Sequence, residues 1–292
     1  MTSDPASLEL AARLLRCPLC AERLAPASGS ALRCPARHTF DVSRHGYISL
    51  LGGARAVSGD DPDMARARER FLATGAYAPV RDAVAALAGG GRDEPEVVLD
   101  VGAGTGYYLA GTLERMPAAH GIALDTSVRS LRVAARAHPR AIAATWDAFR
   151  PFPLADGSVD AVLDVFAPRN PAEFHRVLRP GGRLVVARPT ARHLAELRAE
   201  VAAMVTIDPA KEERLARALA PHVTAVTTRE VEYELTLGAE QARDLIGMTP
   251  SARHLDVHAL GRREGGGAAG EGAAGAGLAV TVSVLVTAYA PR

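Results

Sequence analysis

The sequence feature that most constrains the fold is a short apolar run followed by three glycines at alternate positions. Residues 97–101 are almost all β-branched or apolar, which predicts a buried parallel strand. Gly102, Gly104 and Gly106 then predict a tight turn into a helix over 107–115, because glycine lets the backbone turn sharply and lets a ligand lie against it. The helix N-terminus offers unpaired N–H groups to an anion. The pattern predicts a ligand-binding loop, and its alternative is a glycine-rich turn with only a structural role.

A second strand and a second acid support the ligand-binding interpretation. The glycine spacing is G-x-G-x-G after Asp100, which differs from the G-x-G-x-x-G of dinucleotide folds. Residues 121–125 form another apolar run that ends in Asp125, about twenty residues on, where an acid meets ribose hydroxyls in nucleotide folds. Asp125 is therefore a ribose candidate. Asp125 or Ser127 could also simply cap a helix over 128–137.

All three cysteines of the chain lie near its N-terminus. Cys17 and Cys20 form a C-x-x-C pair, and Cys34 with His38 forms a C-x-x-x-H pair. Three thiolates and an imidazole can complete a tetrahedral structural zinc site. A redox pair at the first two cysteines, or buried unreactive thiols, are the alternatives, but neither needs the second pair at this spacing. His45 is a substitute ligand with poorer spacing.

Charge and hydropathy limit the function classes. The net charge is only +1, so no global basic field indicates nucleic acid, and any such contact must be local. Lys211 is the only lysine, and arginine supplies nearly all the positive charge. No apolar run approaches the length of a membrane span, and the first sixteen residues lack the apolar core of a signal peptide. We expect a cytoplasmic protein with no membrane partner.

Strand and helix patterns alternate through the middle of the chain, which predicts a parallel sheet with helices on both faces. The expected strands are 97–101, 120–124, 141–145, 159–165 and 183–187, with helices at 107–115, 128–137 and 172–178. Earlier elements are helices at 6–16, 64–72 and 77–88 and a hairpin over 21–32 that turns at Gly29. Later elements are helices at 191–204, 208–220 and 239–247 and two strands, 225–237 and 279–289. The Gly/Ala-rich stretch 262–277 predicts a disordered loop.

This pattern divides the chain into three parts. We expect a zinc-binding ribbon with a role in RNA recognition over 1–58, a helical connector over 59–92 and a cofactor-binding domain over 93–292. About sixty residues bury little core, so a metal would fix the first part.

The glycine loop after an acid resembles the first motif of S-adenosylmethionine-dependent methyltransferases. The stretch from Asp147 and Ala148 through 151–160 resembles the adenine-contacting region of the same class. The expected fold is thus α/β, a class I Rossmann-like methyltransferase sheet with a small N-terminal zinc ribbon. The resemblance implies that the loop holds the methionine part of the cofactor, that Asp100 binds its ammonium and that Asp147 accepts from the adenine amino group.

Further motifs resemble one family, the 23S ribosomal RNA guanine-N1 methyltransferases of the tylosin- and mycinamicin-resistance type. They are the two zinc knuckles, the stretches 46–51, 59–68 and 106–108, Phe-Ala-Pro-Arg-Asn-Pro at 166–171, and 192–197. The resemblance implies a structural zinc ion, S-adenosylmethionine, and methylation of a guanine in an rRNA hairpin lining the peptide exit tunnel. The insertion at 262–277 departs from the family pattern.

The motifs and the resemblance together give the candidate site residues. The cofactor candidates follow the motifs in chain order: Asp100, Gly102, Ala103, Gly104, Thr105, Gly106, Tyr107, Tyr108, Asp125, Asp147 and Ala148. The metal candidates are Cys17, Cys20, Cys34 and His38.

Basic and aromatic side chains near the second knuckle suggest how 23S rRNA is held. Arg33, Arg37 and Arg44, with Tyr47 and His45, could form an electrostatic and stacking surface for RNA. The alternative is that these charged side chains are simply exposed to solvent on the surface of a zinc ribbon. The sequence leaves a homodimer undecided.

Catalysis requires that guanine N1 lose its proton before or during methyl transfer. Asp164 and His193 are the candidate proton acceptors, although a carboxylate on a buried strand is as often structural. Phe166 could stack on the target base or pack in the core. A small-molecule methyltransferase and a non-catalytic RNA-binding protein of this fold are the rival functions.

Overall fold

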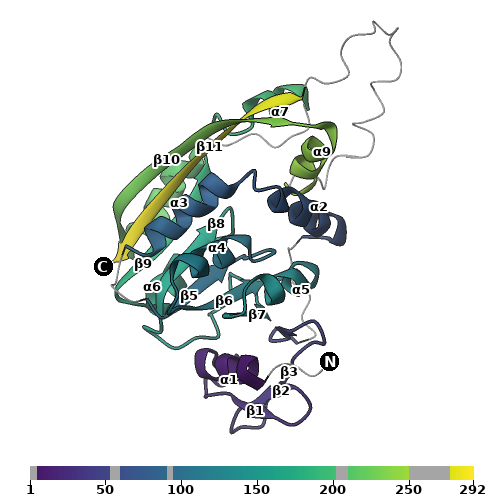
Figure 1. Cartoon of the computed structure of the whole chain (residues 1–292). Coiled ribbons are helices and arrows are strands. Elements are labelled where there is room, and N and C mark those ends of the chain that lie inside the picture. The colour runs from purple at the N-terminus through teal and green to yellow at the C-terminus, as the bar shows by residue number, and fades with distance from the viewer. Residues whose placement is uncertain (1–4, 53–59, 91–94, 202–209, 250–276) are drawn as a thin grey trace, which may run out of the picture.

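The fold is that of an eight-stranded, mostly parallel sheet with a small antiparallel sheet beside it (Figure 1). The computed structural model describes residues 5–52, 60–90, 95–201, 210–249 and 277–292. The large sheet has the strand order β10-β11-β9-β8-β5-β6-β7-β4. The chain order reverses between β5 and β8, and ligands bind in such sheets beyond the carboxyl ends of the strands at that point.

Most of the predicted strands and helices are present, with small shifts at their ends. The strands of the large sheet, apart from β4, are β5 (Val97–Val101), β6 (His120–Asp125), β7 (Ala141–Thr145), β8 (Val159–Val165), β9 (Leu178–Pro189), β10 (Val223–Leu237) and β11 (Leu278–Pro291). The helices are α1 (Pro5–Leu14), α2 (Pro62–Ala73), α3 (Ala78–Ala88), α4 (Tyr107–Arg115), α5 (Val128–Ala137), α6 (Pro171–Val177), α7 (Ala195–Glu200), α8 (Ala210–Leu219) and α9 (Ala239–Gly247). Strand β11 pairs antiparallel with both β9 and β10.

Each face of the sheet has its own hydrophobic core, because successive side chains of a strand point to opposite faces. Val98 packs with Leu109, Leu113 and Leu131 beneath α3, α4 and α5. On the other face, residues of β5 that neighbour Val98 pack with Phe174 and with residues of α1, α6 and α8. Burial on both faces explains why the central strands are nearly continuous apolar runs.

The N-terminal module joins the large sheet directly. Strands β1 (Ala25–Ala27), β2 (Ala31–Arg33) and β3 (Thr39–Asp41) form the small antiparallel sheet, with the predicted turn at Gly29. Strand β4 (Tyr47–Ile48) leaves it and pairs in parallel with β7 at the edge of the large sheet. The module's buried side chains belong to the same core as α1, α6 and α8, so the module is not supported by metal alone.

Some expectations need correction. Strand β9 begins before the strand expected at 183–187. In its first part Arg179 donates to the Asp160 carboxylate (2.7 Å), and Asp160 also accepts from the backbone N–H groups of Glu96 and Val97. Of the helix expected over 191–204, only α7 is helical in the described part. The loop 262–277 lies outside the described residues. No helix of the described chain is long and apolar enough to cross a membrane.

Candidate cofactor and zinc sites

The four predicted metal ligands converge in the N-terminal module. Their ligand atoms all lie within 4.8 Å of one another. The His38 Nδ1 atom lies 3.4 Å from the sulfurs of both Cys17 and Cys34, and the Cys20 and Cys34 sulfurs are 3.7 Å apart. Tetrahedral zinc with bonds of about 2.3 Å to sulfur separates its sulfur ligands by roughly 3.7 Å. The donor set and its spacing therefore fit zinc.

Backbone geometry explains how two short turns present these ligands. In the first knuckle the Ala21 N–H donates to the Cys17 carbonyl, and Ala21 has a positive φ of 59°. In the second knuckle the Arg37 N–H donates to the Cys34 carbonyl, and Arg37 has a φ of 67°. His45, the substitute ligand, is not in this group: its ring contacts Arg44 and Arg136 instead.

The three glycines of the loop between β5 and α4 serve different purposes. A Cβ at Gly102 would lie 2.7 Å from the Cβ of Ala167, and one at Gly106 would lie within 3.1–3.2 Å of Ala134 and Ala137. These two glycines are therefore explained by close packing. Gly104, with φ of 55°, is next to the Arg68 side chain and not to packed backbone. Of the three, Gly104 is the one that close packing does not explain.

Asp125, at the end of β6, anchors this loop. Its Oδ2 accepts from the Gly104 N–H at 2.8 Å, and its Oδ1 accepts from the Ser127 N–H at 2.7 Å. Burial raises the pKa of Asp125, and these two hydrogen bonds oppose that rise. Ser127, rather than Asp125, caps α5 by accepting from the Ser130 N–H. Asp125 is thus free of the capping role and can also accept from ribose hydroxyls.

Asp100 is a buried carboxylate that lacks a counter-charge among the described residues. It is 1% exposed, and no hydrogen-bond donor in the described chain reaches its Oδ2. Burial, and then the carboxylates of Asp125 and Asp164, raise its pKa to about 8. A buried carboxylate beside two others favours a cationic ligand. Because the ammonium of S-adenosylmethionine is such a cation, the predicted site fits this cofactor.

Arg68 and Asp60 lie beside the glycine loop and were not among the residues predicted for the site. Arg68, on α2, donates to both carboxylate oxygens of Asp60 (2.7 and 3.2 Å) and to the Met248 carbonyl (2.8 Å). Its side chain lies over Gly104, since a Cβ there would be 3.4 Å from the Arg68 Cδ. Both residues belong to the motif 59–68, which was noted only as a family signature.

The remaining cofactor candidates differ in how close they lie to this site. The backbone N–H of Trp146 donates to the backbone carbonyl of Asp125 at 2.9 Å, which brings Asp147 beside Asp125. Ala103 donates to the Leu124 carbonyl, and Thr105 is buried within the loop. Three further candidates lie around them. The ring of Tyr107 lies beneath Arg81 of α3, Tyr108 is buried behind the loop, and the carbonyl of Ala148 accepts from Asn170.

An aromatic group borders the carboxyl end of β8. Phe166 has a positive φ of 55°, which is unusual for a bulky residue, and its side chain is 38% exposed. Its ring stacks on His193 (centroids 6.1 Å apart, 23° between planes) and meets the edge of Tyr108. A strained backbone that keeps a ring accessible is typical of functional positions. Phe166 therefore stays a candidate for stacking on a base.

His193 is poorly placed to accept a proton. Its Nδ1 accepts from the Ser283 N–H at 3.2 Å, so in the neutral ring the proton is on Nε2, which is 3.3 Å from the Tyr77 hydroxyl. Burial and then Arg198 lower its pKa to about 4. Asp164 is fully buried and lies 3.1 Å from the Arg169 guanidinium. His193 thus packs against Phe166, and Asp164 is an ion-paired carboxylate.

The three predicted RNA-binding arginines lie in two places. Arg33 donates to Thr39 beside the second knuckle, where Arg37 is also exposed. Arg44 lies on the turn between β3 and β4 and donates to His45.

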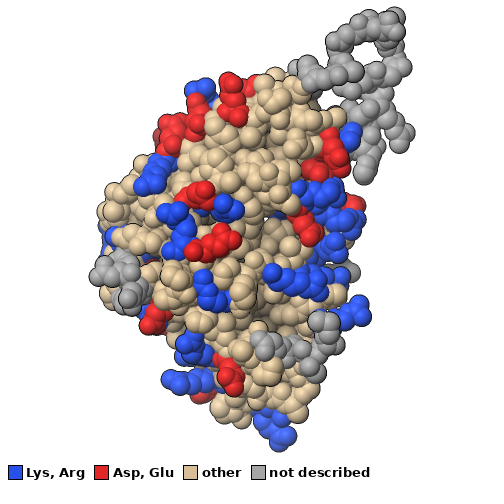
Figure 2. All heavy atoms as spheres, in the orientation of Figure 1, with Lys and Arg blue, Asp and Glu red and all other residues tan. Residues whose placement is uncertain are grey.

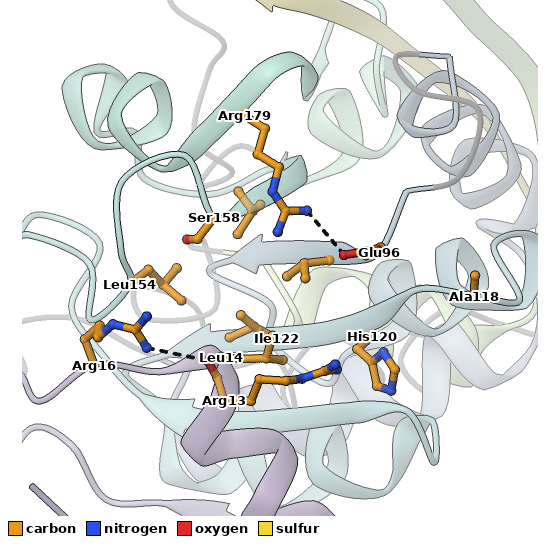
Figure 3. A pocket seen from close by; sticks show the side chains of 12 residues that line it. Arg13, Leu14, Arg16, Glu96, Ala118, His120, Ile122, Leu154, Ser158 and Arg179 are labelled. Atoms are coloured by element: carbon orange, nitrogen blue, oxygen red, sulfur yellow. Dashed lines mark hydrogen bonds and ion pairs between the residues drawn. The ribbon is translucent and has the colours of Figure 1, made fainter. Parts of the chain in front are cut away.

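A cavity of about 400 Å³ lies at the opposite ends of the strands (Figure 3). It is bordered by α1 and by the amino ends of β5, β6 and β8, and Arg179 and Glu96 approach across it to 3.8 Å. Because the glycine loop is at the carboxyl ends, this cavity is separate from the cofactor site.

Comparison with known proteins agrees with this geometry. Residues 15–54 match the family model for the N-terminal zinc ribbon of RlmA, and residues 98–182 match a methyltransferase domain model. The chain is 45% identical over 266 residues to a putative 23S rRNA (guanine-N(1)-)-methyltransferase of Micromonospora griseorubida, covering 85% of this chain and 90% of that one. It is 44% identical to the 23S rRNA (guanine(748)-N(1))-methyltransferase of Streptomyces fradiae, covering 86% and 90%. A putative enzyme of the same kind from Bacillus subtilis is 34% identical, covering 82% and 86%.

The fold and the two sites define a class I S-adenosylmethionine-dependent methyltransferase with an N-terminal zinc ribbon. S-adenosylmethionine is its cofactor, and the ribbon carries a structural zinc site. The chain belongs to the 23S rRNA (guanine-N1)-methyltransferase family.

Proposed function

We propose that this enzyme methylates N1 of a guanine in a 23S rRNA hairpin at the peptide exit tunnel, the equivalent of the guanine 748 named for the Streptomyces fradiae relative. The observation that carries the proposal is high identity extending over both the zinc ribbon and the methyltransferase domain. A small-molecule methyltransferase would not need the ribbon. Methylation of this guanine would confer macrolide resistance. The enzyme would act on its rRNA substrate in the cytoplasm.

The chain's own residues would position the reactants. Bound S-adenosylmethionine supplies an electrophilic methyl group. Asp100 would hold its ammonium and Asp125 its ribose, while Phe166 would stack on the guanine. Most of the rate enhancement would come from this alignment. The proton on guanine N1 must leave as the N–C bond forms, and since His193 has its lone pair engaged and Asp164 is buried and ion-paired, the acceptor would be water.

We also propose the division of labour expected from the sequence: rRNA recognition by the ribbon (1–58), including Arg33, Arg37 and Arg44, a connector (59–92) and a catalytic domain (93–292). The pairing of β4 with β7 means that the first and third parts share one sheet. A homodimer stays a candidate assembly, which light scattering would decide.

Primer extension on 23S rRNA from cells with and without the gene tests the function. A methyl group on guanine N1 blocks base pairing and should stop reverse transcription at one guanine only where the gene is present. A strain carrying the Gly104→Val variant provides the control, because a branched side chain there obstructs the cofactor loop. Identical extension patterns with and without the gene would refute the proposal.

A further inference from the structure

One side of the molecule combines basic side chains from the ribbon and from the methyltransferase domain. Helix α5 carries Arg129, Arg132 and Arg136 at spacings of three and four, so they share one face. The turn between β3 and β4 brings Arg44 and His45 against this face. We call these five residues the α5 basic surface. Figure 2 shows basic side chains gathered over α5.

The turn between β3 and β4 packs directly against α5. The Arg136 guanidinium lies 3.4 Å from the His45 Nδ1 atom, and a Cβ at Gly46 would lie 3.4 Å from the Cβ of Ala135. Strand β4 follows directly and is hydrogen-bonded into the large sheet through Tyr47. The two sources of charge therefore form one continuous surface.

The charges of this surface are not balanced by carboxylates. On the neighbouring α2, Arg66, Arg68 and Arg70 are each ion-paired with an aspartate. The three arginines of α5 have no ion pair with any carboxylate in the described part of the chain. The Nε atoms of Arg129 and Arg132 are also buried without a hydrogen-bond partner there.

Such an arrangement is unfavourable for the protein alone. Like charges three or four residues apart destabilise a helix, and arginine in the first turn opposes the helix dipole. The first turn of α5 contains no acid. Burial and the surrounding arginines, Arg132, Arg44, Arg136 and Arg129 in that order, lower the pKa of His45. A surface that concentrates unpaired positive charge at a cost to stability fits a polyanionic partner.

The position of the surface connects it to the cofactor site. Arg129 is in the first turn of α5, immediately after Asp125 and Ser127, and the Ser127 hydroxyl donates to the Asp60 carbonyl beneath α2. A chain of phosphates crossing α5 would therefore pass the edge of the cofactor site.

We propose that the α5 basic surface binds the sugar–phosphate backbone of the RNA substrate and guides the hairpin from the ribbon to the site of methyl transfer. This inference rests on the proposed rRNA substrate. Because backbone contacts carry no sequence information, the surface supplies affinity and register, while selection of the guanine lies elsewhere.

The test uses the full-length enzyme carrying Arg129→Gln, Arg132→Gln and Arg136→Gln. The control loses the same charge from exposed positions away from α5, Arg115, Arg150 and Arg217. Binding to an in vitro transcribed 23S rRNA hairpin and to an unrelated hairpin of equal length is measured at several salt concentrations. The slope of log affinity against log salt should become shallower by about two units in the α5 variant, equally for both hairpins, and stay unchanged in the control.

Two further readouts separate this proposal from folding and from the proposed function. Cofactor affinity of the α5 variant should equal that of the wild type, and its melting temperature should be the same or higher because repulsion is removed. An unchanged salt slope in an α5 variant that is folded and binds cofactor would overturn the α5 proposal. If the wild-type enzyme fails to methylate the rRNA hairpin but binds both hairpins with the expected slopes, the proposed function fails while the surface stands.

Discussion

The carboxylate of Asp125 holds the backbone N–H of Gly104 at 2.8 Å, which joins the end of β6 to the middle of the glycine loop. The acid at the end of the second strand therefore shapes the loop after the first strand, and it is also the proposed ribose ligand. A side chain with two such functions should affect both folding and binding when it is changed.

Asp125→Asn should lower both stability and cofactor affinity. The amide offers one oxygen where the carboxylate offers two, so the N–H of Gly104 or of Ser127 loses its acceptor. We expect a loss of about 1–3 kcal/mol in the free energy of unfolding and at least tenfold weaker S-adenosylmethionine binding. Thermal unfolding without cofactor and calorimetric titration measure the two effects. An unchanged melting temperature would show that Asp125 does not anchor the loop.

Gly104→Ala should weaken cofactor binding by more than the strain of a left-handed backbone at alanine can explain. A left-handed backbone at alanine costs roughly 1–2 kcal/mol. Gly157→Ala is a matched control, because Gly157 has nearly the same φ (54° against 55°) and a Cβ there would have nothing within 4 Å. Both variants should lose similar stability, but only Gly104→Ala should weaken cofactor binding. Equal cofactor affinity in the two variants would mean that the cofactor does not approach Gly104.

Cofactor affinity should rise with pH up to about 8. The pKa of Asp100 is raised to about 8 by burial and by two nearby carboxylates, and only the ionised form attracts an ammonium. Below pH 8 binding must release this proton, so the dissociation constant should fall by up to about tenfold per pH unit between pH 6 and 7. Asp100→Asn should bind weakly with no such pH dependence. If the dissociation constant of the wild type does not change with pH, Asp100 does not bind the ammonium.

The same ionisation affects the cofactor-free protein. A carboxyl whose pKa is higher in the folded than in the unfolded state contributes stability at low pH, and this contribution is lost as the pH rises through the folded value. The cofactor-free enzyme should therefore lose stability between about pH 4 and pH 8 from this group. Bound cofactor should offset that loss, so the rise in melting temperature on adding cofactor should be larger at pH 8 than at pH 6.

The zinc ligands and most of the sheet were predictable from the sequence, because both depend on local patterns. Ligand spacing indicated Cys17 and His38, and runs of apolar residues indicated the strands. The position of the Arg68–Asp60 pair was not predictable, because Arg68 lies against Gly104, which is distant in the sequence. In the sequence, the charged residues of 59–68 look like those of any exposed helix. The packing roles of Gly102 and Gly106 could not be predicted for the same reason: their neighbours, Ala167, Ala134 and Ala137, lie far along the chain from them.

Zinc removal should loosen the edge of the large sheet while leaving the glycine loop intact. Cys17 and Cys34 are buried in a core that continues to Ile48 of β4. The purified enzyme should contain about one zinc ion, and Cys17→Ser with Cys20→Ser should abolish it. Hydrogen exchange should then accelerate at Tyr47 and Ile48, with cofactor affinity nearly unchanged. A double variant that keeps both its zinc and its protection would disprove the ligand assignment.

The geometry around His193 indicates a positioning residue rather than a proton acceptor. Its Nδ1 accepts from the Ser283 backbone, its ring stacks on Phe166, and its pKa of about 4 keeps it neutral at physiological pH. Removing a true general base usually costs 10²–10⁴-fold in rate. His193→Gln should instead lower kcat by less than about tenfold and raise KM for the RNA hairpin, because Phe166 loses its stacking partner. The pH profile of kcat between pH 6 and 9 should keep its wild-type shape in this variant. Tyr77→Phe, which removes only the hydroxyl near Nε2, should reproduce the effect more weakly. If kcat of His193→Gln fell a hundredfold or more and its pH profile changed, His193 would be the proton acceptor after all.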